Sequence, residues 1–347
     1  MKDLYDAGIF ELDERQQERK QKKIIMQFYS DASKILLFRY IIANVVACVI
    51  IIIYFLGLGN LASIDFFKNK NIPQVIYVLL TVIRFTVANF FSVVYSYKDK
   101  GKKGIKNLIW NKQNNIDKNL IYIIIFLLGI QALSYFSMSL LGKYTEKLAQ
   151  SVSVFNFNGN IYNNISVIAY MLIIAPIFEE IIFREIVLKR FSVVSVKFGV
   201  VMSALLFGLS HSNFLQFSMT FATGIVFAYT VLKFGKIQIA ILCHVFINAI
   251  SLFWAYIEYS CGEHTIICNI ENTYYLICVI LFLVCLMIVT TIKKQVVVST
   301  IKNQSCCATI FEKVKEKEYT YRMILCVPSF VIVIVIYIVS MLLMLAK

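Results

Sequence analysis

Long runs of apolar residues, separated by polar and basic stretches, dominate the chain. Nine runs are candidate membrane-spanning helices: 40–58, 75–97, 119–142, 167–187, 198–212, 214–232, 237–257, 273–292 and 324–346. A helix needs about 20 mostly apolar residues to cross the hydrocarbon core of a bilayer. No run alternates as the strands of a membrane barrel do. The sequence therefore predicts an all-α fold, a polytopic transmembrane helical bundle with eight to nine spans.

The run 198–212 is the shortest of the nine. It predicts a helix that is tilted, broken, or begins earlier, near Phe191. The basic residues give the orientation, because cytoplasmic loops are enriched in Lys and Arg. With the amino terminus cytoplasmic, 27 of the 34 Lys and Arg residues fall in inside segments. We therefore expect a cytoplasmic amino terminus and an external carboxyl terminus.

Composition agrees with a membrane location. Hydrophobic residues make up 59% of the chain and charged residues 16%, against about 25% charged residues in soluble domains. Mean hydropathy is +0.75, which excludes an ordinary cytosolic enzyme. The net charge of +14 fits loops that face anionic lipid headgroups, so the expected partner is the lipid bilayer and not nucleic acid. The high content of Ile, Lys and Asn suggests an AT-rich genome and thus a bacterium. Together with the apolar runs, this predicts an integral, multi-pass protein of a bacterial cell membrane.

Nine cysteines form no C-x-x-C motif, and most lie inside the apolar runs, where cysteine acts as a small apolar residue. Cys261 and Cys268 share a predicted outer loop and could pair in an oxidising exterior. Cys306 and Cys307 lie in a basic loop. A lipidation site there is a weaker hypothesis.

Charged residues inside the runs are concentrated in one place. Arg84 stands alone, whereas the other four lie within seven consecutive positions: Glu179, Glu180, Arg184 and Glu185. Ionisable groups in hydrocarbon are costly and often functional. Glu180 and Arg184 are four residues apart and can form an ion pair on one helix face. Glu179 is rotated from its neighbour by about 100° and is expected to face another part of the bundle.

Just upstream, Pro176 removes a backbone hydrogen bond and should loosen the same helix. Two of the three histidines also lie in predicted spans, while His264 falls in the outer loop. Phe207 and His211 are four residues apart, as are His244 and Asn248, so each pair shares a helix face.

One carboxylate, two imidazoles and a carboxamide are the groups that peptide hydrolysis within a membrane would need. A carboxylate can accept a proton from water, and an imidazole can hold that water. A second imidazole and an amide can stabilise the oxyanion. Glu179, His211 and His244 could equally supply the three ligands of a catalytic zinc, although there is no H-E-x-x-H motif.

Three motifs, E-E-x-x-x-R, F-x-x-x-H and H-x-x-x-N, follow one another on separate apolar runs. They contain these residues: Glu179, Glu180, Arg184, Phe207, His211, His244 and Asn248. In this order they resemble the CPBP family of intramembrane proteases, which includes type II CAAX prenyl endopeptidases and bacteriocin-processing or self-immunity proteins. The resemblance covers about residues 160–292.

The resemblance implies a role for each matched residue. Glu179 would activate the hydrolytic water together with His211, and His244 and Asn248 would stabilise the oxyanion. Glu180 would lie in or beside the site.

The two remaining matched residues have supporting roles in the resemblance. Arg184 would organise its helix, and Phe207 would shape the site. A divalent metal such as zinc is an open possibility in this family, with the two histidines and Glu179 as its candidate ligands.

Four parts of the chain follow from this comparison: a charged cytoplasmic segment at 1–39, three helices with their loops at 40–159, a protease-like membrane core at 160–292, and a basic loop with a final helix at 293–347. Within the predicted core, the three motifs stand at different depths. The run 198–212 must therefore be shifted, broken or tilted for the motifs to meet.

Three functions remain open from the sequence. The leading one is an intramembrane endopeptidase that cleaves a membrane-associated peptide or protein near the cytoplasmic leaflet. A non-catalytic immunity or scaffold protein with the same fold is the second. A proton-coupled transporter is the third, which Arg84 would suit, but no matched pair of broken helices suggests inverted repeats.

Overall fold

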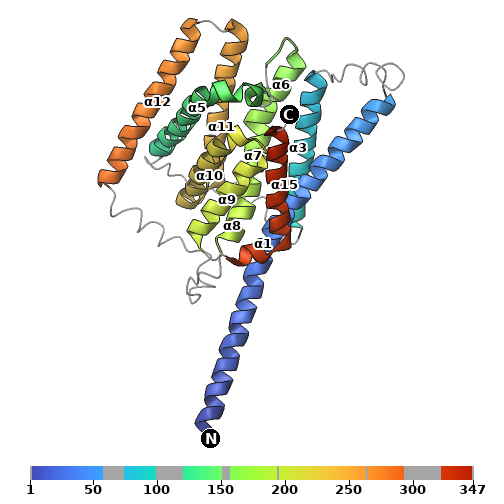
Figure 1. The fold of residues 1–347 in the computed structure, drawn as a ribbon, viewed down its shortest axis with the longest axis vertical. Helices are drawn as coiled ribbons and strands as arrows, with labels where there is room; N and C mark the ends of the chain where they lie inside the picture. The colour runs from blue at the N-terminus through green and yellow to red at the C-terminus, as the bar shows by residue number, and fades with distance from the viewer. Residues whose placement is uncertain are drawn as a thin grey trace.

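The computed structural model describes residues 2–57, 74–98, 120–150, 157–193, 195–262, 265–292 and 322–345. These residues form helices and short turns, with no strand among them. The helices are α1 Lys2–Gly57, α3 Gln74–Tyr97, α5 Leu120–Gln150, α6 Ile161–Ala169, η1 Tyr170–Ile174, α7 Ala175–Glu180, η2 Ile181–Leu188, α8 Lys189–Phe191, α9 Val196–Ser210, α10 Phe214–Phe234, α11 Ile237–Cys261, α12 Thr265–Ile292, η4 Met323–Cys326 and α15 Pro328–Leu345. Figure 1 shows them as a bundle from which the first half of α1 projects.

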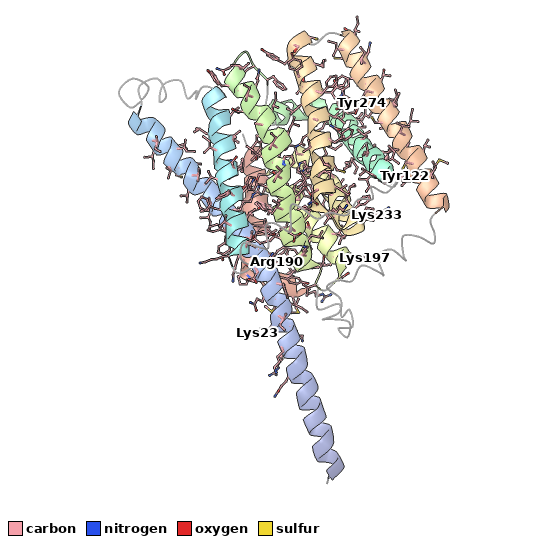
Figure 2. All side chains as sticks on the ribbon, turned by 180° about the vertical axis from the view of Figure 1, so that it is seen from behind. Lys23, Tyr122, Arg190, Lys197, Lys233 and Tyr274 are labelled. Atoms are coloured by element: carbon pink, nitrogen blue, oxygen red, sulfur yellow. The ribbon has the colours of Figure 1, made fainter. Side chains whose placement is uncertain are left out.

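The predicted polytopic helical bundle is confirmed. Seven helical stretches are long and apolar enough to cross a membrane, and two shorter apolar helices, Val196–Ser210 and Pro328–Leu343, accompany them. The run 198–212 forms α9, which has 15 residues and is too short for a full span; it begins at Val196, so the suggested start near Phe191 is wrong. Basic side chains such as Lys23, Arg190 and Lys197 lie toward the end of the bundle from which α1 projects, whereas Tyr274 lies toward the opposite end (Figure 2).

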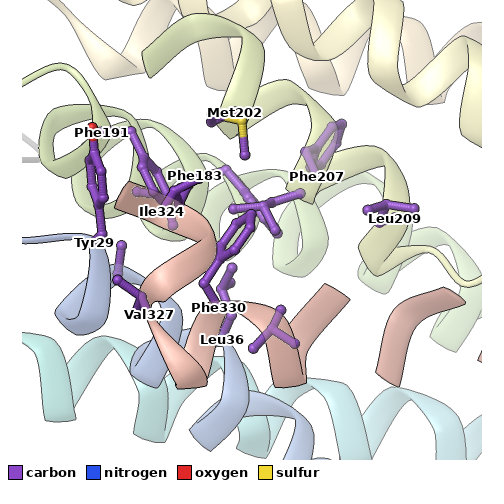
Figure 3. Close-up of a cluster of buried hydrophobic side chains, with 14 of the residues drawn as sticks. Tyr29, Leu36, Phe183, Phe191, Met202, Phe207, Leu209, Ile324, Val327 and Phe330 are labelled. Carbon is purple, nitrogen blue, oxygen red and sulfur yellow. The ribbon is translucent and has the colours of Figure 1, made fainter. Parts of the chain in front are cut away.

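The first span begins earlier than the predicted run 40–58, because the apolar stretch of α1 extends from Lys22 to Ile53. The reason is a buried stripe within the charged segment. Its members recur every three or four residues, which places them on one helix face. They are Ile25, Tyr29, Ala32 and Leu36. The stripe packs against α15 and α8, as Figure 3 shows for Tyr29 with Phe191 and for Leu36 with Phe330.

Residues Ile161–Phe191 form one continuous helical path through the bundle. Asn160 caps its start, because the Asn160 side chain accepts hydrogen bonds from the N–H groups of Tyr162 and Asn163. Two π-helical stretches, η1 and η2, interrupt the path on either side of the short α7. Such stretches occur often at functional sites. The two glutamates at the end of α7 thus lie between two irregular turns.

Small residues let α9 and α10 approach closely. A Cβ atom on Gly224 would stand 3.2 Å from Ala204 and 3.2 Å from the Phe207 ring. This contact places Phe207 beside α10. At the periphery, α12 packs beside α5 and exposes many apolar side chains.

Further sequence predictions concern the cysteines and His264. Cys261 and Cys268 are both exposed and unpaired, so the suggested disulfide is not formed in this structure. His264, Cys306 and Cys307 lie outside the described residues.

Candidate active site

Glu180 is held on both of its carboxylate oxygens. One oxygen, Oε2, accepts a hydrogen bond from Arg184 Nε at 3.0 Å. The other, Oε1, stands 3.2 Å from His244 Nδ1. Glu180 and Arg184 are both 0% exposed, so the ion pair predicted from their spacing is confirmed and is fully buried. Glu180 is therefore neutralised in place.

Arg184 links its own helix to two neighbours. Arg184 Nη1 donates a hydrogen bond to Ser203 Oγ at 2.9 Å, and this hydroxyl in turn donates to the Phe183 carbonyl at 2.8 Å. The guanidinium carbon also lies over the rings of Phe207, at 4.9 Å, and Phe227, at 5.9 Å. A planar guanidinium combines such forked hydrogen bonds with aromatic stacking. Arg184 thus joins η2 to α9 and α10.

Glu179 has looser contacts. Glu179 Oε2 lies 4.0 Å from His244 Nε2, and Oε1 lies 4.0 Å from Arg39 Nη2. Both distances exceed that of a hydrogen bond. The prediction that Glu179 faces a different part of the bundle from Glu180 is wrong in one respect, since both carboxylates reach the same imidazole. Their side chains leave the helix in different directions but are long enough to approach opposite edges of the ring.

The hydrogen bonds of the two histidines fix their protonation pattern. A deprotonated carboxylate and a backbone carbonyl can only accept. His244 Nδ1 faces Glu180, so Nδ1 carries a hydrogen and Nε2 faces Glu179. His211 Nδ1 lies 2.9 Å from the Phe207 carbonyl, so it too carries a hydrogen. In neutral His211, Nε2 is therefore an acceptor.

Phe207 brings the two imidazoles together. Its ring centroid lies 4.9 Å from that of His211 and 6.0 Å from that of His244, both nearly perpendicular. His211 follows the last residue of α9, where Ser212 has a positive φ of 53°. Because α9 ends there, His211 lies at the turn that leads into α10. The short α9 thus brings His211 to the Phe207 ring, which His244 also contacts.

Asn248 contacts the backbone of the irregular helix. Asn248 Nδ2 donates to the Met171 carbonyl at 2.8 Å. In η1 the Ala175 N–H bonds to the Tyr170 carbonyl, five residues back. The next residue, Pro176, would bond to the Met171 carbonyl in the same pattern, but proline has no N–H. The Asn248 carboxamide supplies the missing donor.

Residues 161–250 match the protein-family model described as "Type II CAAX prenyl endopeptidase Rce1-like". This segment contains every residue of the three sequence motifs, which the structure brings around His244 and Phe207. This match supports membership of the CPBP family for residues 161–250, the CPBP segment. No curated protein and no solved structure matches the chain.

The CPBP segment, residues 161–250, does not contain the whole site. Arg39 of α1 approaches Glu179 and donates a hydrogen bond from Nε to Asn89 Oδ1 of α3 at 2.6 Å. Both residues precede the CPBP segment, and sequence reasoning missed them. Arg39 is the last residue of the segment 1–39, which the sequence predicts to be cytoplasmic. The signal was its position three residues after Leu36, which continues the buried stripe of α1.

The three candidate metal ligands do not form a cluster. In the described part of the CPBP segment and its surroundings, no three His, Cys, Asp or Glu side chains lie close enough together to hold a metal ion. Among the described residues, the three candidate ligands therefore do not form a three-ligand zinc site in this structure.

Proposed function

We propose that the protein is an intramembrane endopeptidase that hydrolyses a peptide bond in a membrane-associated peptide or protein. The observation that carries the proposal is that the two glutamates differ in the contacts of their carboxylates. Glu180 is neutralised by Arg184, whereas Glu179 has no contact shorter than 4.0 Å among the ion pairs of the described residues. A buried carboxylate that keeps its accepting capacity is suited to take a proton from water.

In the proposed reaction, Glu179 accepts a proton from the water that attacks the scissile carbonyl carbon. His211 holds the same water through Nε2. As the carbon–nitrogen bond breaks, Glu179 returns the proton to the departing amine, so water is consumed and a carboxylic acid and an amine are formed.

Oxyanion stabilisation is the proposed role of His244 and Asn248. The Asn248 amide has two N–H groups, and only one is needed for the Met171 carbonyl. His244 can donate from Nε2 when that nitrogen is protonated. Donors of this kind are typically worth about 3 kcal/mol in the transition state.

The substrate is proposed to lie near the cytoplasmic leaflet of a bacterial membrane. A leader peptide, a peptide pheromone or another membrane protein would fit such a position. Proteases of this family act within membranes, and the basic end of the bundle marks one membrane surface.

The test compares cells that carry the native protein with cells that carry Glu179→Ala or His211→Ala. Membrane proteomes and released peptides should lose at least one cleavage product in both variants, with a rate loss of about 10²–10⁴-fold for a missing general base. Glu185→Gln is the matched control, since Glu185 lies on the same helix and pairs with exposed Lys189. All four proteins, the native one and the three variants, should reach the membrane in equal amounts.

Retained cleavage in Glu179→Ala would reject the proposed mechanism. An unchanged phenotype with no cleavage in the native protein would favour the non-catalytic immunity or scaffold alternative. Proton-coupled uptake by the purified protein in liposomes, without any hydrolysis, would favour a transporter.

A further inference from the structure

The buried site holds two carboxylates, and each has a guanidinium beside it. Arg184 lies against Glu180, and Arg39 faces Glu179. With neutral imidazoles, the four charged groups sum to zero. An uncompensated charge in an apolar interior costs several kcal/mol. Arg39 therefore balances the one carboxylate that Arg184 does not reach.

Arg39 is itself held by helices outside the CPBP segment. Arg39 Nε donates to Asn89 of α3, and the side chain also forms a hydrogen bond with Tyr337 of α15. The guanidinium carbon lies 5.7 Å from the Phe183 ring. Arg39 is only 7% exposed and Asn89 0%. These contacts hold the guanidinium near Glu179 Oε1, whereas His244 approaches Oε2.

We propose that Arg39 is a positioning residue for the Glu179 carboxylate. Its charge holds Glu179 Oε1, so that Oε2 stays directed at His244 Nε2. The first and last helices, α1 and α15, are thereby parts of the site and not only a membrane anchor. The effect on cleavage rests on the proposed function, whereas the electrostatic coupling between Arg39 and Glu179 does not.

A double-mutant cycle on the intact, detergent-solubilised protein tests the coupling without a substrate. The variants are Arg39→Gln, Glu179→Gln and the pair, and the readout is the apparent Tm. Arg39→Gln should lower Tm in the native background and much less in the Glu179→Gln background, because the second change removes the unbalanced carboxylate. Glu180→Gln is the matched control background, in which Arg39→Gln should keep its full effect.

Additive losses in the Glu179→Gln background would overturn the proposal, as would equal coupling to both glutamates. If Arg39→Gln does not fold, Asn89→Ala replaces it. Asn89→Ala keeps the charge of Arg39 but removes its hydrogen-bond acceptor, so the same pattern should appear with a smaller Tm shift.

Cleavage of the substrate whose product is identified in the comparison of cells provides the second readout. Arg39→Gln should lower kcat by at least tenfold with little change in KM, and Arg39→Lys should restore part of the loss because it keeps the positive charge. Ser33→Ala is the control, since Ser33 is also buried on α1 but bonds only to the Tyr29 carbonyl among the hydrogen bonds described. Equal losses in Arg39→Lys and Arg39→Gln would contradict a role for the charge. Absence of cleavage in the native protein would reject the proposed function and leave the Tm result standing.

Discussion

The two halves of the candidate site differ in how tightly they are built. On the Arg184 side, Glu180 is bonded at 3.0 and 3.2 Å and every partner comes from the CPBP segment. On the Arg39 side, Glu179 has its two charged neighbours at 4.0 Å, and one of them comes from α1. Both carboxylate oxygens of Glu180 have a hydrogen-bond partner, although Arg184 Nη2 has none among the described residues. The carboxylate of Glu179 keeps its accepting capacity.

This difference suggests that two adjacent residues have different roles, a structural one for Glu180 and a chemical one for Glu179. A saturated buried carboxylate fixes neighbouring helices and the tautomer of His244. A carboxylate without close hydrogen bonds can exchange a proton with a bound water. The contrast also predicts which substitutions damage the fold and which damage only the reaction.

The largest effect is expected on the saturated side. Arg184→Met removes the partner of Glu180 and leaves a buried carboxylate uncompensated, which costs about 3–5 kcal/mol in comparable cases. We expect a large loss of folded protein in the membrane, measured by protein yield and by the apparent Tm in detergent. Adding Glu180→Gln should recover much of the loss. If Arg184→Met alone were as stable as the native protein, the two halves would not differ as proposed.

The most predictable part of the site was local in sequence. The ion pair between Glu180 and Arg184 follows from their separation of four residues, because helical neighbours at that spacing share a face. The short α9 was also predictable from the length of its apolar run. The meeting of His211 and His244 around Phe207 was not derivable from spacing, and only the family resemblance suggested it.

The parts that sequence reasoning missed depend on contacts between distant segments. Arg39 reaches Glu179 only because α1 continues as one helix through the charged segment. The π-helical turn η1 depends on Pro176 together with a donor 77 residues away from Met171, on α11. Periodicity in one segment predicts which face is buried but does not identify what the face contacts.

An intermediate effect on stability is expected at Asn248, whose side chain bonds to the backbone of the π-helical stretch η1. Asn248→Ala should leave the Met171 carbonyl without its donor, which costs about 1–3 kcal/mol for a buried group. The apparent Tm in detergent should fall accordingly. Pro176→Ala restores a backbone N–H beside this carbonyl and should recover stability in the Asn248→Ala background. Recovery of stability without recovery of cleavage would separate the proposed oxyanion role of Asn248 from its contact with the backbone.

The smallest effect is expected one helical turn beyond the site. Glu185 pairs with Lys189, whose side chain is 55% exposed, and solvent screens such a pair strongly. Glu185→Gln should therefore change stability by no more than about 0.5 kcal/mol and leave cleavage at the native rate. Thermal unfolding in detergent and the cleavage assay check both statements.

Because Glu179, Glu180 and Glu185 lie within seven residues of one helix, the three substitutions to Gln compare the same chemical change in different surroundings. A large stability loss in Glu185→Gln would mean that any charge removed from this helix is costly. The contrast between the two halves of the site could then not be attributed to Arg184 and Arg39.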